Sequence, residues 1–276
     1  MKLMSFRDAS GRTGWGAVEG DKVADLTASA PSLRAALAAG RAISVPASAP
    51  RLDLASLAYL PPIPDPEKII CVGLNYLTHI LEGGREPPAM PTIFTRWANT
   101  QVGHGQPMVR PKVSATFDYE GELAFVIGKR CRHVAEADAM SVVAGYSCYN
   151  DGSIREWQRH STQFTPGKNF PATGGFGPFL VTPDEVGDIT RSSLVTRLNG
   201  REVQRATIDD LVFGVARLVA YCSGFTVLEP GDVVITGTTG GVGAYHKPPL
   251  WMKPGDTVEV EISGVGTLSN PIVDEA

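Results

Sequence analysis

The distribution of apolar and polar positions predicts a chain built mainly from short β-strands. Short apolar runs bounded by Gly, Pro, Asp and Asn recur along the whole sequence, and TVEVEI near the C-terminus alternates strictly. Two of the later strands each follow a Pro-Gly-Asp turn. The predicted strands are 2–6, 15–18, 22–25, 68–72, 121–127, 233–236 and 257–262.

Two segments have the spacing of helices. Residues 32–39 lie between Pro31 and Gly40, which suit the start and the stop of a helix. Residues 208–222 place apolar side chains at helical spacing, with Thr207 as a candidate cap. Strands outnumber helices, so we expect a β-rich α+β fold.

A proline-rich passage divides the chain. Residues 45–66 contain six prolines, at positions 46, 50, 61, 62, 64 and 66, and this composition favours a connector over a helix or a central strand. We predict a small N-terminal domain with its linker over 1–62 and a larger domain over 63–276.

Composition and charge exclude some classes of partner. The 276 residues carry 25 Lys+Arg and 29 Asp+Glu, a net charge of −4, which disfavours a protein that binds nucleic acids or anionic membranes by charge. The four cysteines form no CxxC pair, and neither a signal-peptide pattern nor a bilayer-length apolar run is present. We expect a soluble, cytoplasmic protein with reduced thiols.

Acidic residues are the first candidates for chemistry. Asp118, Glu120 and Glu122 alternate along a strand-like segment, so their side chains are expected on one side, where they would repel one another unless a cation joined them. Carboxylates without nearby His or Cys favour Mg²⁺, Mn²⁺ or Ca²⁺. A solvated sheet edge is the alternative. Asp151 follows an apolar stretch and could be a further ligand or a helix cap.

A possible general base lies at His79 and Glu82. They are three positions apart, so on a helix the carboxylate can orient the imidazole, although a plain surface contact has the same spacing. The glycine-rich segment 82–88 that follows could act as a lid hinge.

Two loops complete the set of candidates. Lys168 lies in a loop rich in Thr, Pro and Gly, where it could equally be a solvated lysine. The glycine-rich stretch 237–243 follows a predicted strand but lacks a phosphate-loop motif, so its backbone N–H groups better suit a substrate carboxylate. No GxSxG, HExxH or recognisable catalytic cysteine motif is present.

Taken in order, these motifs resemble the fumarylacetoacetate hydrolase family. The resemblance rests on GLNYxxHxxE, YEGELAFVIG, YNDGSIREWQ, GKNF and GTTGGVG, and it covers roughly residues 66–276. It implies the mixed β-sandwich roll of that family, a small N-terminal domain and a homodimer. The chain departs from the usual family pattern at Gly152 and Thr239, which puts the identity of the substrate in doubt.

The resemblance also implies a role for individual residues. It implies one Mg²⁺ or Mn²⁺ ion, with Ca²⁺ as a possible substitute, held by Glu120, Glu122 and Asp151, and leaves Asp118 as a bystander. The catalytic residues it implies are His79, Glu82 and Lys168. The residues expected to contact substrate are Tyr76, Arg155, Gln158, Gly237 and Thr238. Apart from the resemblance, the residues that could line a pocket, or could equally be surface or core residues, are Arg96, Trp97, His160, Phe176 and His246.

The resemblance implies a small 2-oxo acid as substrate. We expect a hydrolase that cleaves the C3–C4 bond of a 2,4-dioxo acid of the acylpyruvate or fumarylpyruvate type with water activated by His79, while Lys168 stabilises the pyruvate enolate. Decarboxylation, isomerisation or hydration of a 2-oxo acid on the same site is the alternative. A non-catalytic protein that binds oxo acids is a third possibility.

Overall fold

Twelve strands from both ends and the middle of the chain form one large mixed sheet. The computed structural model describes all 276 residues. Two short strands lie off the main path of the sheet: β5 (Ala58–Tyr59) pairs with β1, and β8 (Gln101–Val102) pairs with β14. The main path runs in the order β4 (Arg51–Asp53), β3 (Lys22–Asp25), β2 (Thr13–Glu19), β1 (Lys2–Arg7), β14 (Gly174–Val181), β12 (Val143–Asp151), β11 (Gly121–Ile127), β17 (Val233–Thr238), β6 (Ile69–Gly73) and β7 (Thr92–Arg96).

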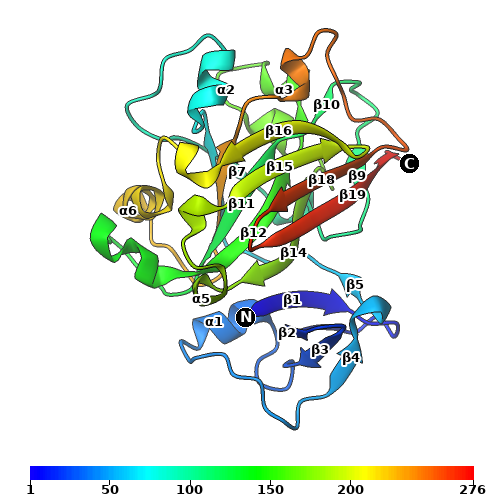
Figure 1. Cartoon of the computed structure of the whole chain (residues 1–276), viewed down its shortest axis with the longest axis vertical. Helices are drawn as coiled ribbons and strands as arrows, with labels where there is room; N and C mark the ends of the chain where they lie inside the picture. Colours follow the sequence, from blue (N-terminus) through cyan, green and yellow to red (C-terminus); the bar gives the residue numbers. More distant parts are fainter.

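A smaller sheet packs against the middle of the large one (Figure 1). Its five strands are β16 (Arg201–Thr207), β15 (Ser193–Leu198), β18 (Thr257–Ile262), β19 (Gly266–Asp274) and β9 (Met108–Arg110). A separate two-stranded ribbon joins β10 (Phe117–Asp118) and β13 (Ser153–Ile154). The helices are α1 (Leu33–Ala38), α2 (Leu77–Glu82), α3 (Arg155–Gln158), α4 (Thr165–Lys168), α5 (Pro183–Val186) and α6 (Val215–Phe225), and short 3₁₀ turns are η1 (Leu54–Ser56), η2 (Ala98–Thr100), η3 (Glu136–Val142), η4 (Ile189–Arg191), η5 (Ile208–Asp210) and η6 (Gly243–Tyr245).

Strand β11 is apolar because both of its faces are covered. Leu123 and Phe125 point into the core shared with the five-stranded sheet and α6. Ala124 and Val126 point to the opposite face, into the core shared with α1 and the N-terminal strands. A strand buried on both faces has a continuous apolar run, which is the pattern seen at 121–127.

The N-terminal strands lie at one end of the molecule, drawn in blue (Figure 1). Strand β1 pairs with β14, with Lys2 opposite Val181, so backbone hydrogen bonds connect these strands to the central part of the sheet. Within 45–66 the only strands are β4, at an edge, and the two-residue β5. The predicted boundary near residue 62 thus separates two parts that share one sheet.

The β-rich α+β class is confirmed, as are the seven predicted strands and the helix near 32–39, with small shifts at their ends. The helix predicted over 208–222 is wrong in its bounds. Residues 208–210 form only a 3₁₀ turn, and α6 begins at Val215, because the N–H groups of Val212 and Phe213 are bonded to the backbone and side-chain oxygens of Asn75. None of the helices is long and apolar enough to cross a membrane.

Candidate functional site

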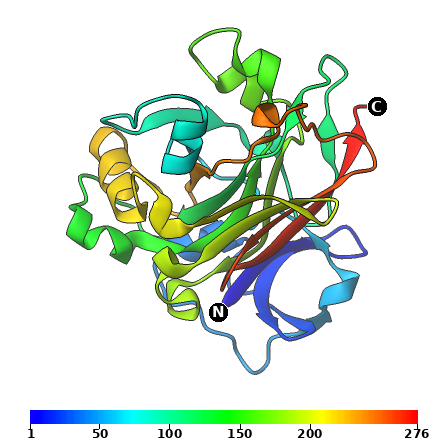
Figure 2. The ribbon, with the colours of Figure 1, turned by 45° about the horizontal axis from the view of Figure 1, so that its top comes forward.

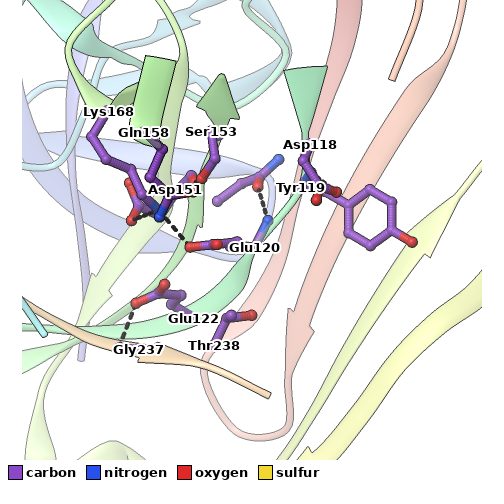
Figure 3. A network of polar contacts seen from close by, with 12 residues as sticks. Asp118, Tyr119, Glu120, Glu122, Asp151, Ser153, Gln158, Lys168, Gly237 and Thr238 are labelled. Carbon is purple, nitrogen blue, oxygen red and sulfur yellow. Dashed lines mark hydrogen bonds and ion pairs between the residues drawn. The ribbon is translucent and has the colours of Figure 1, made fainter. Parts of the chain in front are cut away.

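Three buried carboxylates meet where β11 begins and β12 ends. The two strands are antiparallel neighbours, with Gly121 opposite Asn150, so Glu120 and Glu122 lie beside Asp151. One oxygen from each of the three side chains lies within 4.8 Å of the others, and Figure 3 shows the three groups pointing toward one another. The alternative interpretation, a solvated sheet edge, is wrong because all three residues are buried.

Each of these carboxylates has one oxygen bound by a donor of the protein. Asp151 Oδ1 accepts from Arg96 at 2.5 Å, and Glu120 Oε1 accepts from Arg155 at 2.6 Å. Glu122 Oε2 accepts from the backbone N–H of Gly237 at 2.5 Å. The second oxygen of each group is not bound by these three donors, and three such single oxygens are the arrangement expected for a bound cation.

A lysine ammonium already bridges two of these remaining oxygens. Lys168 Nζ lies 2.6 Å from Glu120 Oε2 and 2.6 Å from Asp151 Oδ2, and the side chain is only 1% exposed. The possibility of a solvated lysine is thereby excluded. Lys168 also lies 5.3 Å from the ring centre of Phe94, which favours the charged ammonium.

The electrostatics of the three acids differ sharply. Burial opposes the charge of Glu120, yet the adjacent Lys168 and Arg155 lower its pKa to about 2. Glu122 pairs with no cation, and burial and the charges of Asp151 and Glu120 outweigh the opposing effect of Lys168 and raise its pKa well above the usual range. A carboxylate in this position lacks a counter-charge, and a divalent cation would supply one.

The buried charges around the site are consistent with a divalent ion. Beside the three acids and Asp118, the structure buries only three cations, Arg96, Arg155 and Lys168, so negative charge exceeds positive by one. Hard oxygen donors without His or Cys suit Mg²⁺ or Mn²⁺. The donor set, its charge and its burial all fit such an ion.

Asp118 does not join the ligand set, in contrast to the expectation that it shares a face with Glu120 and Glu122. It belongs to the short strand β10, ahead of the break before β11, and lies to one side in Figure 3. Its carboxylate accepts from Arg155 Nε at 2.7 Å and from the N–H groups of Gly243 and Ala244 at 2.8 and 2.9 Å. Asp118 therefore stays outside the ligand set, as the resemblance implied, and contributes indirectly by binding Arg155, which in turn binds Glu120.

His79 and Glu82 lie together on α2, as predicted. His79 Nδ1 and Glu82 Oε2 are 3.6 Å apart, and Nδ1 has no hydrogen-bond partner. The Glu82 carboxylate is fixed from its other side by the N–H of Gly241, 3.1 Å from both oxygens. Thr239, one of the departures from the family pattern, contacts Thr78 of α2 with its hydroxyl at 3.0 Å. The glycine-rich loop therefore positions the helix that carries the dyad.

The start of the glycine-rich loop forms hydrogen bonds to Glu122 and to the backbone of Gly121. Besides the Gly237 N–H bond, Thr238 donates its hydroxyl to Gly121 O at 3.0 Å. Buried Gln204 links both segments, since it accepts from Gly121 N at 2.9 Å and donates to Thr238 Oγ1 at 2.8 Å. Sequence reasoning missed Gln204 because no motif surrounds it.

Part of this site lines a cavity of about 500 Å³. His79, Lys168, Arg155, Gln158 and Thr238 face it, and Glu120 and Glu122 form its floor. Its remaining walls are formed mainly by Val72, Leu74, Thr92, Phe94, Phe164, Val242 and Tyr245.

Several expected pocket residues lie elsewhere. Tyr76 is fully buried, packs in the apolar core and does not line the cavity, so the structure contradicts its predicted contact with substrate. Gly237 does not line the cavity and acts only through Glu122. Arg96 lies beneath Asp151 rather than in the wall. Four other candidates also lie outside the lining: Trp97, His160, Phe176 and His246.

Comparison with known proteins shows what this chain is similar to. The family described as "Fumarylacetoacetate (FAA) hydrolase C-terminal" matches residues 68–273. The mitochondrial oxaloacetate tautomerase fahd2 of Xenopus laevis is 39% identical over 99% of this chain and 90% of its own length.

Two solved structures cover the whole of this chain and are themselves covered completely. A fumarylacetoacetate hydrolase from Exiguobacterium antarcticum has a TM-score of 0.90 at 34% identity. A 5-carboxymethyl-2-hydroxymuconate delta-isomerase from Mycobacterium smegmatis has a TM-score of 0.84 at 31% identity. The match to more than half of the chain and these similarities together show that the chain belongs to the fumarylacetoacetate hydrolase family.

Proposed function

We propose that this protein interconverts the enol and keto forms of a small 2-oxo acid, with oxaloacetate as the first candidate. The observation that carries the proposal is the cavity whose floor holds Glu120 and Glu122 and whose walls hold Lys168 and His79. The choice of tautomerisation is supported by the Xenopus laevis relative, which is an oxaloacetate tautomerase and matches almost the whole chain.

Glu120, Glu122 and Asp151 would hold the divalent ion. Such an ion, when bound, supplies Lewis acidity that favours the enolate form of a 2-oxo acid. Arg96, Arg155 and the Gly237 N–H each fix one carboxylate oxygen, so the ligands need little rearrangement.

His79 would act as the general base and acid that transfers the proton. Removal of a proton from C3 of the keto acid gives an enolate, and protonation of the oxygen on C2 gives the enol; the double bond moves from C2=O to C2=C3, and no bond between heavy atoms breaks. Glu82, fixed by Gly241, orients the imidazole, and the Lys168 ammonium stabilises the negative oxygen. Arg155, Gln158 and Thr238 bound the space beside the reacting carbons.

The test follows the decay of enol-oxaloacetate, coupled to a malate dehydrogenase that uses only the keto form. We expect metal-stripped enzyme to be inactive until Mg²⁺ or Mn²⁺ is added, and Glu120→Gln to remove that response. His79→Gln should lower kcat by about 10²- to 10⁴-fold. His160→Gln is the control, because His160 is exposed and does not line the cavity.

Two results would contradict the proposal. One is full activity of His79→Gln, which would remove the imidazole from the proton transfer. The other is activity that does not depend on added metal.

Hydrolysis of a 2,4-dioxo acid, expected from the sequence, becomes the second candidate. It uses the same enolate stabilisation and is supported by the Exiguobacterium antarcticum hydrolase. Its signature is stoichiometric release of pyruvate and a carboxylic acid from an acylpyruvate. Release of CO₂ and pyruvate from oxaloacetate would instead favour the decarboxylase.

A further inference from the structure

The outer part of the cavity carries two arginines that the reaction above does not use. Arg85 and Arg159 both line the cavity and both are exposed. Neither guanidinium has a carboxylate within 4.0 Å or a hydrogen bond to the protein, whereas Arg51 and Arg205 at the surface pair with Glu19 and Glu202. Two unpaired cations at one cavity are suited to bind an anionic group.

The two arginines come from different walls. Arg85 follows α2, the helix of His79, and Arg159 directly follows α3, the helix of Arg155 and Gln158. In Figure 2, α2 in cyan and the segment of α3 and α4 in green lie on the side of the molecule away from the blue N-terminal strands. A substrate held at the floor by its first two carbons would extend toward these segments.

The balance of charge favours a substrate with two negative groups. A divalent cation would turn the excess of one negative charge at the floor into an excess of one positive charge. The single carboxylate of a 2-oxo monoacid balances that charge but leaves both Arg85 and Arg159 without a partner. Guanidinium groups bind carboxylates through paired N–H donors, so a second carboxylate is their natural ligand.

We propose that Arg85 and Arg159 bind the distal carboxylate of a 2-oxo dicarboxylic acid and give the site its preference for diacids. The proposal rests on the proposed function, which places the 2-oxo end of the substrate at the floor. The cavity of about 500 Å³ has room for diacids longer than four carbons, so the class is defined by the second carboxylate and not by oxaloacetate alone.

The test compares two acids of equal length in calorimetric titrations of the Mg²⁺-loaded protein. 2-Oxoglutarate carries the distal carboxylate, and 2-oxopentanoate carries a methyl group in its place. We expect 2-oxoglutarate to bind about tenfold more tightly, and this ratio to decrease in 0.5 M NaCl because exposed charges are screened. Arg85→Gln and Arg159→Gln should each lower the ratio by about three- to fivefold without changing the affinity for 2-oxopentanoate.

Arg191→Gln is the matched control. Arg191 is also exposed and unpaired, but it lies on η4 and does not line the cavity, so its loss should leave the ratio unchanged. Equal affinities for the two acids in the wild type, or an unchanged ratio in the Arg85→Gln/Arg159→Gln double variant, would overturn this inference alone. Failure of both acids to bind with Mg²⁺ present would contradict the proposed function as well.

Discussion

At the scale of single residues, the candidate metal site depends on cations that lie outside it. Arg96 is 2% exposed and makes four hydrogen bonds, to Asp151 Oδ1, Gly152 O, Thr173 Oγ1 and Thr100 Oγ1. Its guanidinium fixes the orientation of the Asp151 carboxylate and neutralises part of the buried negative charge. The role of Arg96 is therefore both to position a ligand and to stabilise the fold.

We predict that Arg96→Met destabilises the metal-free protein by about 3–5 kcal/mol, because it leaves a buried carboxylate without its partner. The matched control is Arg110→Met, which breaks an ion pair with Asp274, 57% exposed, and should cost less than about 1 kcal/mol. Urea denaturation of both variants in EDTA measures the free energies of unfolding. Equal losses in the two variants would show that Arg96 contributes no more than a surface ion pair.

At the scale of elements, close packing favours glycine at the position between the two glutamates. At the start of β11, Glu120, just before the strand, and Glu122 point to one face, and Gly121 between them faces Thr196 of β15. A Cβ built at Gly121 would overlap the hydroxyl oxygen of Thr196, which is buried and has no hydrogen-bond partner. The close approach of β11 to β15 therefore explains the glycine within the EGE motif.

We predict that Gly121→Ala lowers the free energy of unfolding by about 1–3 kcal/mol, because one methyl group is forced into a packed interface. Adding Thr196→Ala should restore much of this loss, since it removes the overlapping hydroxyl without breaking a hydrogen bond. Denaturation of the two single variants and the double variant gives the coupling energy. Additive losses, with no rescue in the double variant, would contradict this account of Gly121.

Most elements could be predicted from the sequence because their signals are local. The run at 121–127 predicted β11, and the alternation at 257–262 predicted β18. The start of α6 was missed because it is determined by Asn75, far away in sequence, which binds the N–H of Phe213 at 2.8 Å. Tertiary contacts of this kind leave no trace in a short window.

The same limit applies to the site. The motifs placed His79 and Lys168 in one cavity with the acidic floor. They did not reveal that Tyr76, within the same motif as His79, turns into the core, because the motif fixes spacing but not the direction of a side chain. Arg96 and Gln204 support the site from strands with no recognisable motif, so only the structure could assign their contacts.

At the scale of the whole molecule, one loop packs between β5, which pairs with the N-terminal strand β1, and the C-terminal strand β19, and contacts both. The loop at 103–106 passes so close to Tyr59 that Gly103 has no room for a Cβ. On its other side, Asn270 of β19 donates its amide to Gly103 O at 2.9 Å. In this loop His104 packs its ring 4.9 Å from that of Tyr59, and its Nδ1 accepts the N–H of Ser269 at 3.1 Å.

Burial of His104 lowers its pKa below the ordinary value of 6.5, so the imidazole stays neutral to a lower pH in the folded protein than in the unfolded chain. As the pH falls through 6.5, the unfolded chain binds a proton at His104 before the folded protein does. This histidine therefore stabilises the fold above pH 6.5, and its contribution is lost as the pH falls toward the lowered pKa. Protonation would also remove the acceptor for Ser269 N.

We predict that the free energy of unfolding, measured with urea in EDTA from about pH 8 to about pH 5, falls less steeply with decreasing pH in His104→Asn than in the wild type. Groups at the metal site titrate alike in both proteins, so the difference between the two curves isolates His104. His133→Asn should keep the wild-type slope, because His133 is exposed and its φ of 53° suits asparagine. Parallel curves for the wild type and His104→Asn would mean that the contact between the two ends of the chain does not depend on a neutral His104.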